Sequence, residues 1–307
     1  MMRTENFCQK PTRRMFKKFL RHKTGLLGSF LLFSFIFLAI LAPIITSYDP
    51  YTQNLTERLL PPSSKHLFGT DYAGRDIFTR IIYGARISLI IGFISVFFAL
   101  SFGVFLGLIS GYFGGVWDIV IMRLIDIMLA FPTILLAIGI VAVLGPKLEN
   151  TMIAVGIVSI PTFARVVRAS VLSIKEKDFI AAAKAVGVST GKILLKHILP
   201  NIVAPIIVQA TLGIASAILE AAGLSFLGLG AKPPTPEWGA MLSESRQYLR
   251  SAPWTVVFPG LAIMLLVLAF NLFGDALRDV FDPKSYRGGA KIWGIERSLW
   301  GSKKELP

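Results

Sequence analysis

DFIAAAKAVGVSTGKILLKHILP, the sequence of Asp178–Pro200, decides the fold because it is a short charged insert between two long apolar runs. Its first half has the i, i+3, i+4, i+7 spacing of one helical face, at Phe179, Ala182, Ala183 and Val186. We expect Gly187 to end this helix, since glycine readily adopts the left-handed conformation that closes one. Ser189 is placed to cap a second helix, and Pro200 to mark the boundary to the next apolar run. The alanine-rich face would let a partner approach closely, so the insert is predicted to be a docking element.

Six apolar runs surround this insert, and each has the roughly 20 residues that a helix needs to cross a bilayer. They are Gly25–Ser47, Ile87–Gly111, Ile119–Leu144, Thr151–Leu172, Ile202–Leu219 and Ala252–Phe273. The chain is 54% hydrophobic and only 16% charged, with a mean hydropathy of +0.65. These values are typical of a multi-span membrane protein rather than of a soluble domain. We therefore predict an all-α membrane protein with six transmembrane helices.

Positive charge is concentrated beside the apolar runs. The net charge is +14, and 22 of the 32 lysines and arginines lie before residue 24, between Arg165 and Lys196, or between Arg278 and Lys304. Cytoplasmic loops of membrane proteins carry such an excess. With six spans, all three blocks and both termini lie in the cytoplasm. This distribution argues against nucleic-acid binding, and the length of the first apolar run argues against a cleaved signal peptide.

Four stretches resemble the sequences of one transporter family. The first is A-A-x-x-x-G followed further on by L-P, at Ala182, Ala183, Gly187, Leu199 and Pro200. The others are HLFGTDYAGRDIFTRIIYGARISL at His66–Leu89, EAAGLSFLGLGAKPPTPEWG at Glu220–Gly239 and NLFGDALRDVFDPK at Asn271–Lys284. Together they resemble the C-type transmembrane permease subunit of binding-protein-dependent ABC importers for dipeptides, oligopeptides and nickel. Ala181 departs from the family pattern, which has Glu there.

The resemblance implies an ATP-driven importer in a bacterial cytoplasmic membrane, with this chain as a multi-pass permease. A second homologous permease would complete the translocation path for dipeptides or oligopeptides, and an extracytoplasmic binding protein would deliver them. Two cytosolic ATPases would hold ATP and magnesium and would dock on the insert. The implied coupling residues are Phe179, Ala182, Ala183, Gly187, Leu199 and Pro200. Nickel or a glutathione-like compound is the alternative substrate.

The expected organisation follows from the apolar runs and this resemblance. Residues 1–24 form a basic cytoplasmic tail, and residues 25–86 form the first transmembrane helix and an external loop. Residues 87–283 form a five-helix permease core that contains the cytoplasmic coupling loop 173–200. Residues 284–307 form a cytoplasmic tail.

The second stretch gives an external signature, which consists of Gly69, Asp71, Gly74, Arg75, Asp76 and Arg80. Its glycines permit tight bends, and its charged residues can pair with one another. Either a purely structural turn or contact with substrate fits this pattern. Glu220 is expected near the outer membrane face, as part of an external gate or as a solvated group.

Several residues inside the runs are also informative. Arg123 and Asp126 have the i, i+3 spacing of an intrahelical ion pair, with a structural role or a place on the path. Pro132 and Pro161 are expected to kink their helices. Gly103, in a G-x-x-x-G pattern with residue 107, favours close helix packing.

Some kinds of chemistry are not indicated by the sequence. The chain has no G-x-x-x-x-G-K-[ST] phosphate loop, so ATP hydrolysis is expected only in partner subunits. His66 and His197 have no second ligand at a metal-binding spacing, and the single cysteine, Cys8, cannot form an intrachain disulfide. A secondary transporter and a non-transporting membrane scaffold are the two alternative classes. Neither clear mid-membrane carboxylates nor repeated halves, which would favour a secondary transporter, are visible.

Overall fold

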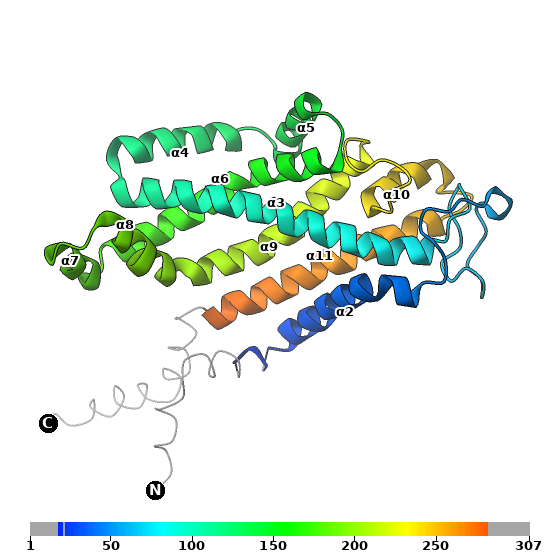
Figure 1. Ribbon diagram of the computed structural model, residues 1–307, viewed down its shortest axis with the longest axis horizontal. Coiled ribbons are helices and arrows are strands. Elements are labelled where there is room, and N and C mark those ends of the chain that lie inside the picture. The colour runs from blue at the N-terminus through cyan, green and yellow to red at the C-terminus, as the bar shows by residue number, and fades with distance from the viewer. Residues whose placement is uncertain (1–17, 21, 282–307) are drawn as a thin grey trace, which may run out of the picture.

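The computed structural model describes residues 18–20 and 22–281, and this part of the chain is helical apart from its loops and one isolated bridge between Thr70 and Asp76 (Figure 1). The predicted tails and Cys8 lie mostly or wholly outside the described residues. The elements in chain order are α2 (Lys23–Ile45), η1 (Leu55–Glu57), α3 (Ile77–Phe113), α4 (Gly115–Leu129), α5 (Thr133–Leu144), α6 (Leu148–Lys175), α7 (Asp178–Ala185), α8 (Thr190–Lys192), η2 (Ile193–Ile198), α9 (Leu199–Phe226), α10 (Trp238–Ser245), η3 (Arg246–Tyr248) and α11 (Trp254–Phe281).

The long helices α2, α3, α6, α9 and α11 run along the molecule, as Figure 1 shows. At one end lie α7 and α8, and at the other lie α10 and residues 48–76; we call these the α7 end and the α10 end. Glycines bring α3 and α6 close together, as the G-x-x-x-G pattern predicted. A Cβ atom at Gly103 would lie only 2.4 Å from the Cβ of Phe163, and one at Gly107 would lie 2.7 Å from the carbonyl oxygen of Ala164.

Within the described residues, five helices are long and apolar enough to cross a membrane: α2, α3, α6, α11 and the continuous helix Thr190–Phe226. A sixth span is present only if α4 and α5 are counted together, and these two helices meet at 94°. The predicted span Ile119–Leu144 is therefore divided into two helices, at the proline that was expected to kink it. Pro132 explains the break, because it caps α5 and disfavours helical geometry at the residue before it. Pro161, by contrast, lies inside an unbroken α6.

Two predicted boundaries also differ from the structure. Helix α3 begins at Ile77, ten residues before the predicted start, because the Asp76 carboxylate accepts a hydrogen bond from the Thr79 amide and caps the helix. Pro200 was expected to separate the insert from the next span, but the helix continues through it. The π-helical stretch η2 ends two residues before Pro200, and its wider turn accommodates the proline ring and the missing backbone donor.

Candidate functional site

Gly187 ends α7 at the α7 end of the molecule. Its φ is +76°, and its amide donates to the Lys184 carbonyl oxygen at 3.0 Å. The amide of Val188 donates to the Ala183 carbonyl oxygen, also at 3.0 Å. This pair of bonds is the usual way in which a left-handed glycine closes a helix. The predicted end of the helix at Gly187 is confirmed.

Helix α7 has a buried face and an exposed one. Ile180 and Ala183 are buried in a cluster that also contains Ile193 and Ile198. Phe179 remains 43% exposed and Val186 remains 79% exposed; Ala182 lies between them and is also exposed. The four residues predicted to share one docking face are therefore divided, because Ala183 is needed to pack α7 onto the bundle. We call the exposed residues Phe179, Ala182 and Val186 the α7 patch. Among the other implied coupling residues, Leu199 is half-buried and Pro200 is exposed.

Tyr112 holds α7 against the ends of two long helices. The Nζ atoms of Lys175 on α6 and Lys184 on α7 lie 5.8 Å and 5.3 Å from the centre of its ring. Cations at this distance from a ring face are attracted to it. The two contacts join α7 to α3 and the end of α6 to α3.

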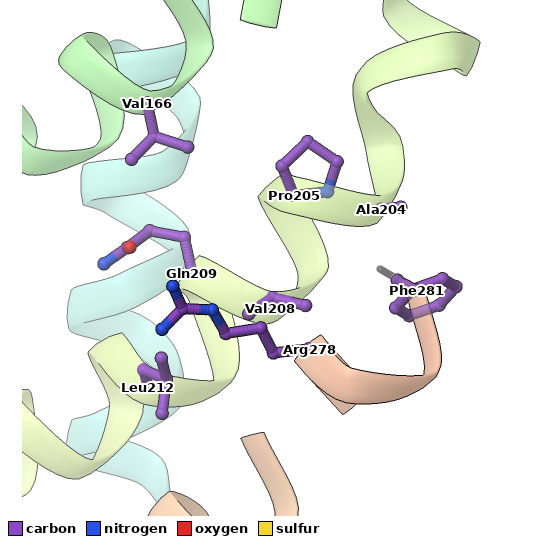
Figure 2. Close-up of a pocket in the computed structure, with 8 residues that line it drawn as sticks. All are labelled: Val166, Ala204, Pro205, Val208, Gln209, Leu212, Arg278 and Phe281. Carbon is purple, nitrogen blue, oxygen red and sulfur yellow. The ribbon is translucent and has the colours of Figure 1, made fainter. Parts of the chain in front are cut away.

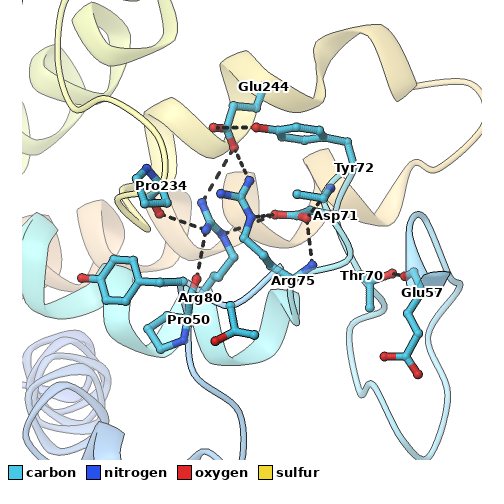
Figure 3. Close-up of polar contacts among 12 residues, drawn as sticks. Pro50, Glu57, Thr70, Asp71, Tyr72, Arg75, Arg80, Pro234 and Glu244 are labelled. Atoms are coloured by element: carbon cyan, nitrogen blue, oxygen red, sulfur yellow. Dashed lines mark hydrogen bonds and ion pairs between the residues drawn. The ribbon is translucent and has the colours of Figure 1, made fainter. Parts of the chain in front are cut away.

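At the α10 end, the external signature forms a buried charge network (Figure 3). Arg75 Nε lies 2.6 Å from Asp71 Oδ2, and Arg75 Nη2 lies 2.9 Å from Glu244 Oε2 on α10. Arg80 adds longer contacts of 3.6 Å and 3.7 Å to the same two carboxylates. Burial opposes the charge of Arg75, but the two carboxylates outweigh it and raise the pKa of this guanidinium above its ordinary value.

Arg80 also connects segments that are far apart in the sequence. Its Nη1 donates to the carbonyl oxygens of Pro50 and Pro234, both at 3.1 Å. The network therefore fastens the chain after α2 and the loop before α10 to the start of α3. Arg75 and Arg80 are each at most 1% exposed. This burial favours the structural interpretation of the signature over direct substrate contact.

The remaining signature residues shape the same loop. Gly74 has a φ of +74°, and a Cβ atom there would lie 1.8 Å from the carbonyl oxygen of Asn54. Gly69 is left-handed as well, with a φ of +76°. Asp76 accepts from His66 Nδ1 at 2.9 Å while it caps α3. His66 is thus engaged with carboxylates, and no cluster of three metal-ligating side chains occurs in the described ranges.

Helix α10 is anchored by Glu237 and Trp238, which lie in the family stretch Glu220–Gly239 but were not predicted as site residues. Glu237 caps the helix by accepting from the amides of residues 239 and 240, although burial raises the pKa of its carboxyl group. Trp238 is buried, and its Nε1 donates to the Ile81 carbonyl oxygen at 3.1 Å. Glu244 was also missed, because it lies 169 residues after Arg75 and no local spacing links the two.

The charged residues inside the runs have partners that differ from those predicted. Asp126 pairs with Arg165 on α6 at 2.6 Å, not with Arg123, which is exposed. The predicted intrahelical pair was wrong because α6 runs alongside α4 and presents its own arginines. Glu220 is half-buried, and its Oε2 is buried with no hydrogen-bond partner in the described part of the chain. This oxygen is thus not solvated at the interface.

Asp118→Asn should loosen α4 from α6. Asp118 accepts two hydrogen bonds of 2.6 Å from Arg168, and both side chains are partly exposed. We expect a loss of about 1 kcal/mol, because solvent screens a pair of this exposure. Thermal unfolding of the detergent-purified protein measures the loss. Glu149→Gln, at an exposed position in the first turn of α6, is the control. An equal midpoint for the two variants would contradict the prediction.

Comparisons with known proteins agree with this geometry. Residues 103–286 match the family described as "Binding-protein-dependent transport system inner membrane component", and residues 10–62 match the N-terminal transmembrane domain of oligopeptide transport permease C. The chain is 58% identical to the dipeptide transport system permease protein DppC of Alkalihalophilus pseudofirmus. The alignment of 274 residues covers 89% of this chain and 90% of the relative. It is 49% identical over 278 residues to the glutathione transport system permease protein GsiD of Escherichia coli, covering 89% and 91%.

A solved structure shows the same fold. The inward-facing MetNI methionine ABC transporter aligns with a TM-score of 0.54 at 20% identity, over 67% of this chain and 98% of that one. The matches and the long apolar helices together describe a multi-pass protein of the bacterial inner membrane, and a transport subunit rather than an ATPase. The chain belongs to the family of inner-membrane permease components of binding-protein-dependent ABC importers.

Proposed function

We propose that this permease imports dipeptides. The observation that carries the proposal is its 58% identity, over 89% of its length, to a permease named for dipeptide transport. A second homologous permease completes the path, and an extracytoplasmic binding protein supplies the peptide. Two cytosolic ATPase subunits, which hold ATP and magnesium, drive the cycle. Glutathione, itself a small peptide, is the second candidate because a relative named for its transport is 49% identical.

The α7 end is the ATPase-docking end in this proposal, and it faces the cytoplasm. Four lysines on or beside α7, α8 and η2 support this orientation, namely Lys177, Lys184, Lys192 and Lys196. The α7 patch offers apolar contact area on a short helix, the kind of element that fits a groove in a partner. A push on this end reaches the opposite end through the unbroken helix Thr190–Phe226.

The α10 end receives the binding protein in this proposal. Its loops are fixed to α3 and α10 by the buried charge network, so they form a surface whose shape persists when the bundle moves. Such a surface lets a loaded binding protein dock without first ordering the loops, which lowers the entropic cost of association.

Uptake into proteoliposomes tests the proposal. The complete importer is purified through a tag on this chain and reconstituted, and labelled dipeptide and glutathione are offered in parallel with the binding protein. We expect ATP-dependent accumulation of dipeptide above that of glutathione. Stronger accumulation of glutathione would transfer the assignment to the second candidate. Uptake that stops when ion gradients are collapsed, with ATP intact, would instead indicate a secondary transporter.

A further inference from the structure

A cavity of about 470 Å³ lies between α6, α9 and the last turn of α11, close to the α7 end (Figure 2). Most of its wall is apolar and comes from all three helices, including Val166, Pro205, Leu212 and Phe281. Small-molecule sites have volumes of this order and combine apolar walls with a few polar groups. We call this hollow the seam cavity.

Two polar side chains enter the seam cavity from facing helices. Arg278 extends from α11 across to α9, and its guanidinium ends beside Gln209, as Figure 2 shows. Neither an ion pair nor a hydrogen bond of Arg278 occurs among the described residues. The adjacent acid, Asp279, is engaged elsewhere, since its Oδ2 lies 2.9 Å from His22 Nε2 beside α2. The cavity therefore presents the positive charge of Arg278 and the side-chain amide of Gln209. No carboxylate of the described residues forms an ion pair with this arginine.

A second cavity, of about 390 Å³, continues the first toward the α7 end. The two share Pro205, and the second is lined partly by the polar residues Ser170, Ser173 and Asn201. Together they make a hollow along the seam between α6 and α9, from mid-helix down to the start of the coupling segment. A solute inside the seam cavity thus has an exit toward the proposed cytoplasmic side.

We propose that the seam cavity binds the C-terminal carboxylate of the peptide in transit, with Arg278 holding the charge and the Gln209 amide as a second donor. This inference rests on the proposed function. The guanidinium fork matches a carboxylate, and the pairing is charge-assisted. The apolar wall can contact peptide side chains of different types. The site therefore selects for a free C-terminal carboxylate and not for a particular peptide sequence.

Paired substrates test the inference in the reconstituted complete importer. Uptake of a labelled dipeptide is compared with uptake of the same dipeptide carrying a C-terminal amide, for the wild type and for Arg278→Gln. For each variant we take the ratio of free-acid uptake to amide uptake. The binding protein is the same in all variants, so its own preference between the two peptides does not affect the comparison of these ratios. We expect this ratio to fall about tenfold in Arg278→Gln, through loss of the free-acid peptide alone, with partial rescue by Arg278→Lys.

Arg123→Gln is the matched control, because Arg123 is an exposed arginine on α4 outside the cavity. Equal loss of both peptides in Arg278→Gln would overturn the inference, since it would mark a role in folding or assembly. An unchanged ratio would overturn it as well. If the effect of the variant appears only in vesicles that contain phosphatidylglycerol, and not in phosphatidylcholine alone, the anion is a lipid headgroup instead of the peptide. A wild type that transports neither peptide would refute the proposed function, and this inference with it.

Discussion

Arg75→Met is expected to destabilise the α10 end severely. Arg75 makes the two shortest ion pairs of the buried network, to Asp71 and to Glu244, and its side chain is fully buried. Its removal leaves the carboxylates of Asp71 and Glu244 with Arg80 as their cationic partner, at the longer distances of 3.6 Å and 3.7 Å. Neutral donors remain, since the amides of residues 73 and 75 still reach Asp71 and the hydroxyl of residue 72 still reaches Glu244. Breaking one partner out of a buried charge network costs roughly 3–5 kcal/mol, because the remaining charge is uncompensated. Thermal unfolding of the detergent-purified protein should show a large fall in the midpoint.

A control and a rescue variant make this result specific. Arg58→Met removes an exposed arginine from the same external segment and should leave the midpoint nearly unchanged. Adding Glu244→Gln to Arg75→Met removes the surplus carboxylate and should recover part of the loss. If Arg75→Met proved as stable as Arg58→Met, the network would not be what holds these loops together.

Gly187→Val should reduce peptide uptake about tenfold or more while the protein still inserts and assembles. A Cβ atom at Gly187 would meet nothing within 4 Å, so no clash is involved. The effect comes from the φ of +76°, which a β-branched residue adopts only at a cost of roughly 1–3 kcal/mol. The end of α7 would therefore rearrange and displace the α7 patch. ATP-driven uptake, normalised to assembled complex, is the measurement.

Gly191→Val is the matched control for this variant. Gly191 lies in α8, with open space around it and without a left-handed backbone, so valine should be tolerated there. Uptake by Gly191→Val is expected to remain close to the wild type. Normal uptake by a correctly assembled Gly187→Val variant would refute the assignment of α7 as the coupling element.

Features that depend on neighbouring residues were predictable from the sequence. The closure of α7 at Gly187, the break at Pro132 and the glycine packing of α3 each follow from one residue type in a local pattern. The family was recognisable for the same reason, since its motifs are contiguous. Exact boundaries were less accessible: the cap at Asp76 starts α3 early, and a hydropathy window does not detect a cap.

Features that depend on distant residues were not predictable. Glu244 completes the α10-end network from another helix. Asp126 pairs with Arg165 on α6 instead of with Arg123, its neighbour on α4. Arg75 pairs with its local partner Asp71 and with Glu244 as well, whereas Asp126 does not pair with its local candidate on α4. Only the packing of the helices decides these partners. The division of α7 into two faces has the same origin, because it depends on where Ile180 meets the bundle.

The π-helical stretch η2 carries a consequence for how the coupling segment can vary in length. A π-turn is equivalent to one residue inserted into an α-helix. Deleting one residue from Ile193–Ile198 would restore regular winding and leave α8 at nearly the same angle around the axis of α9, because the π-turn absorbs the extra residue. Deleting one residue from the regular helix after Pro200 would instead turn α8 by about 100°, although no side chain had been replaced. Homologous segments can therefore be exchanged between permeases only when their phase is preserved, and residue count matters there as much as residue identity.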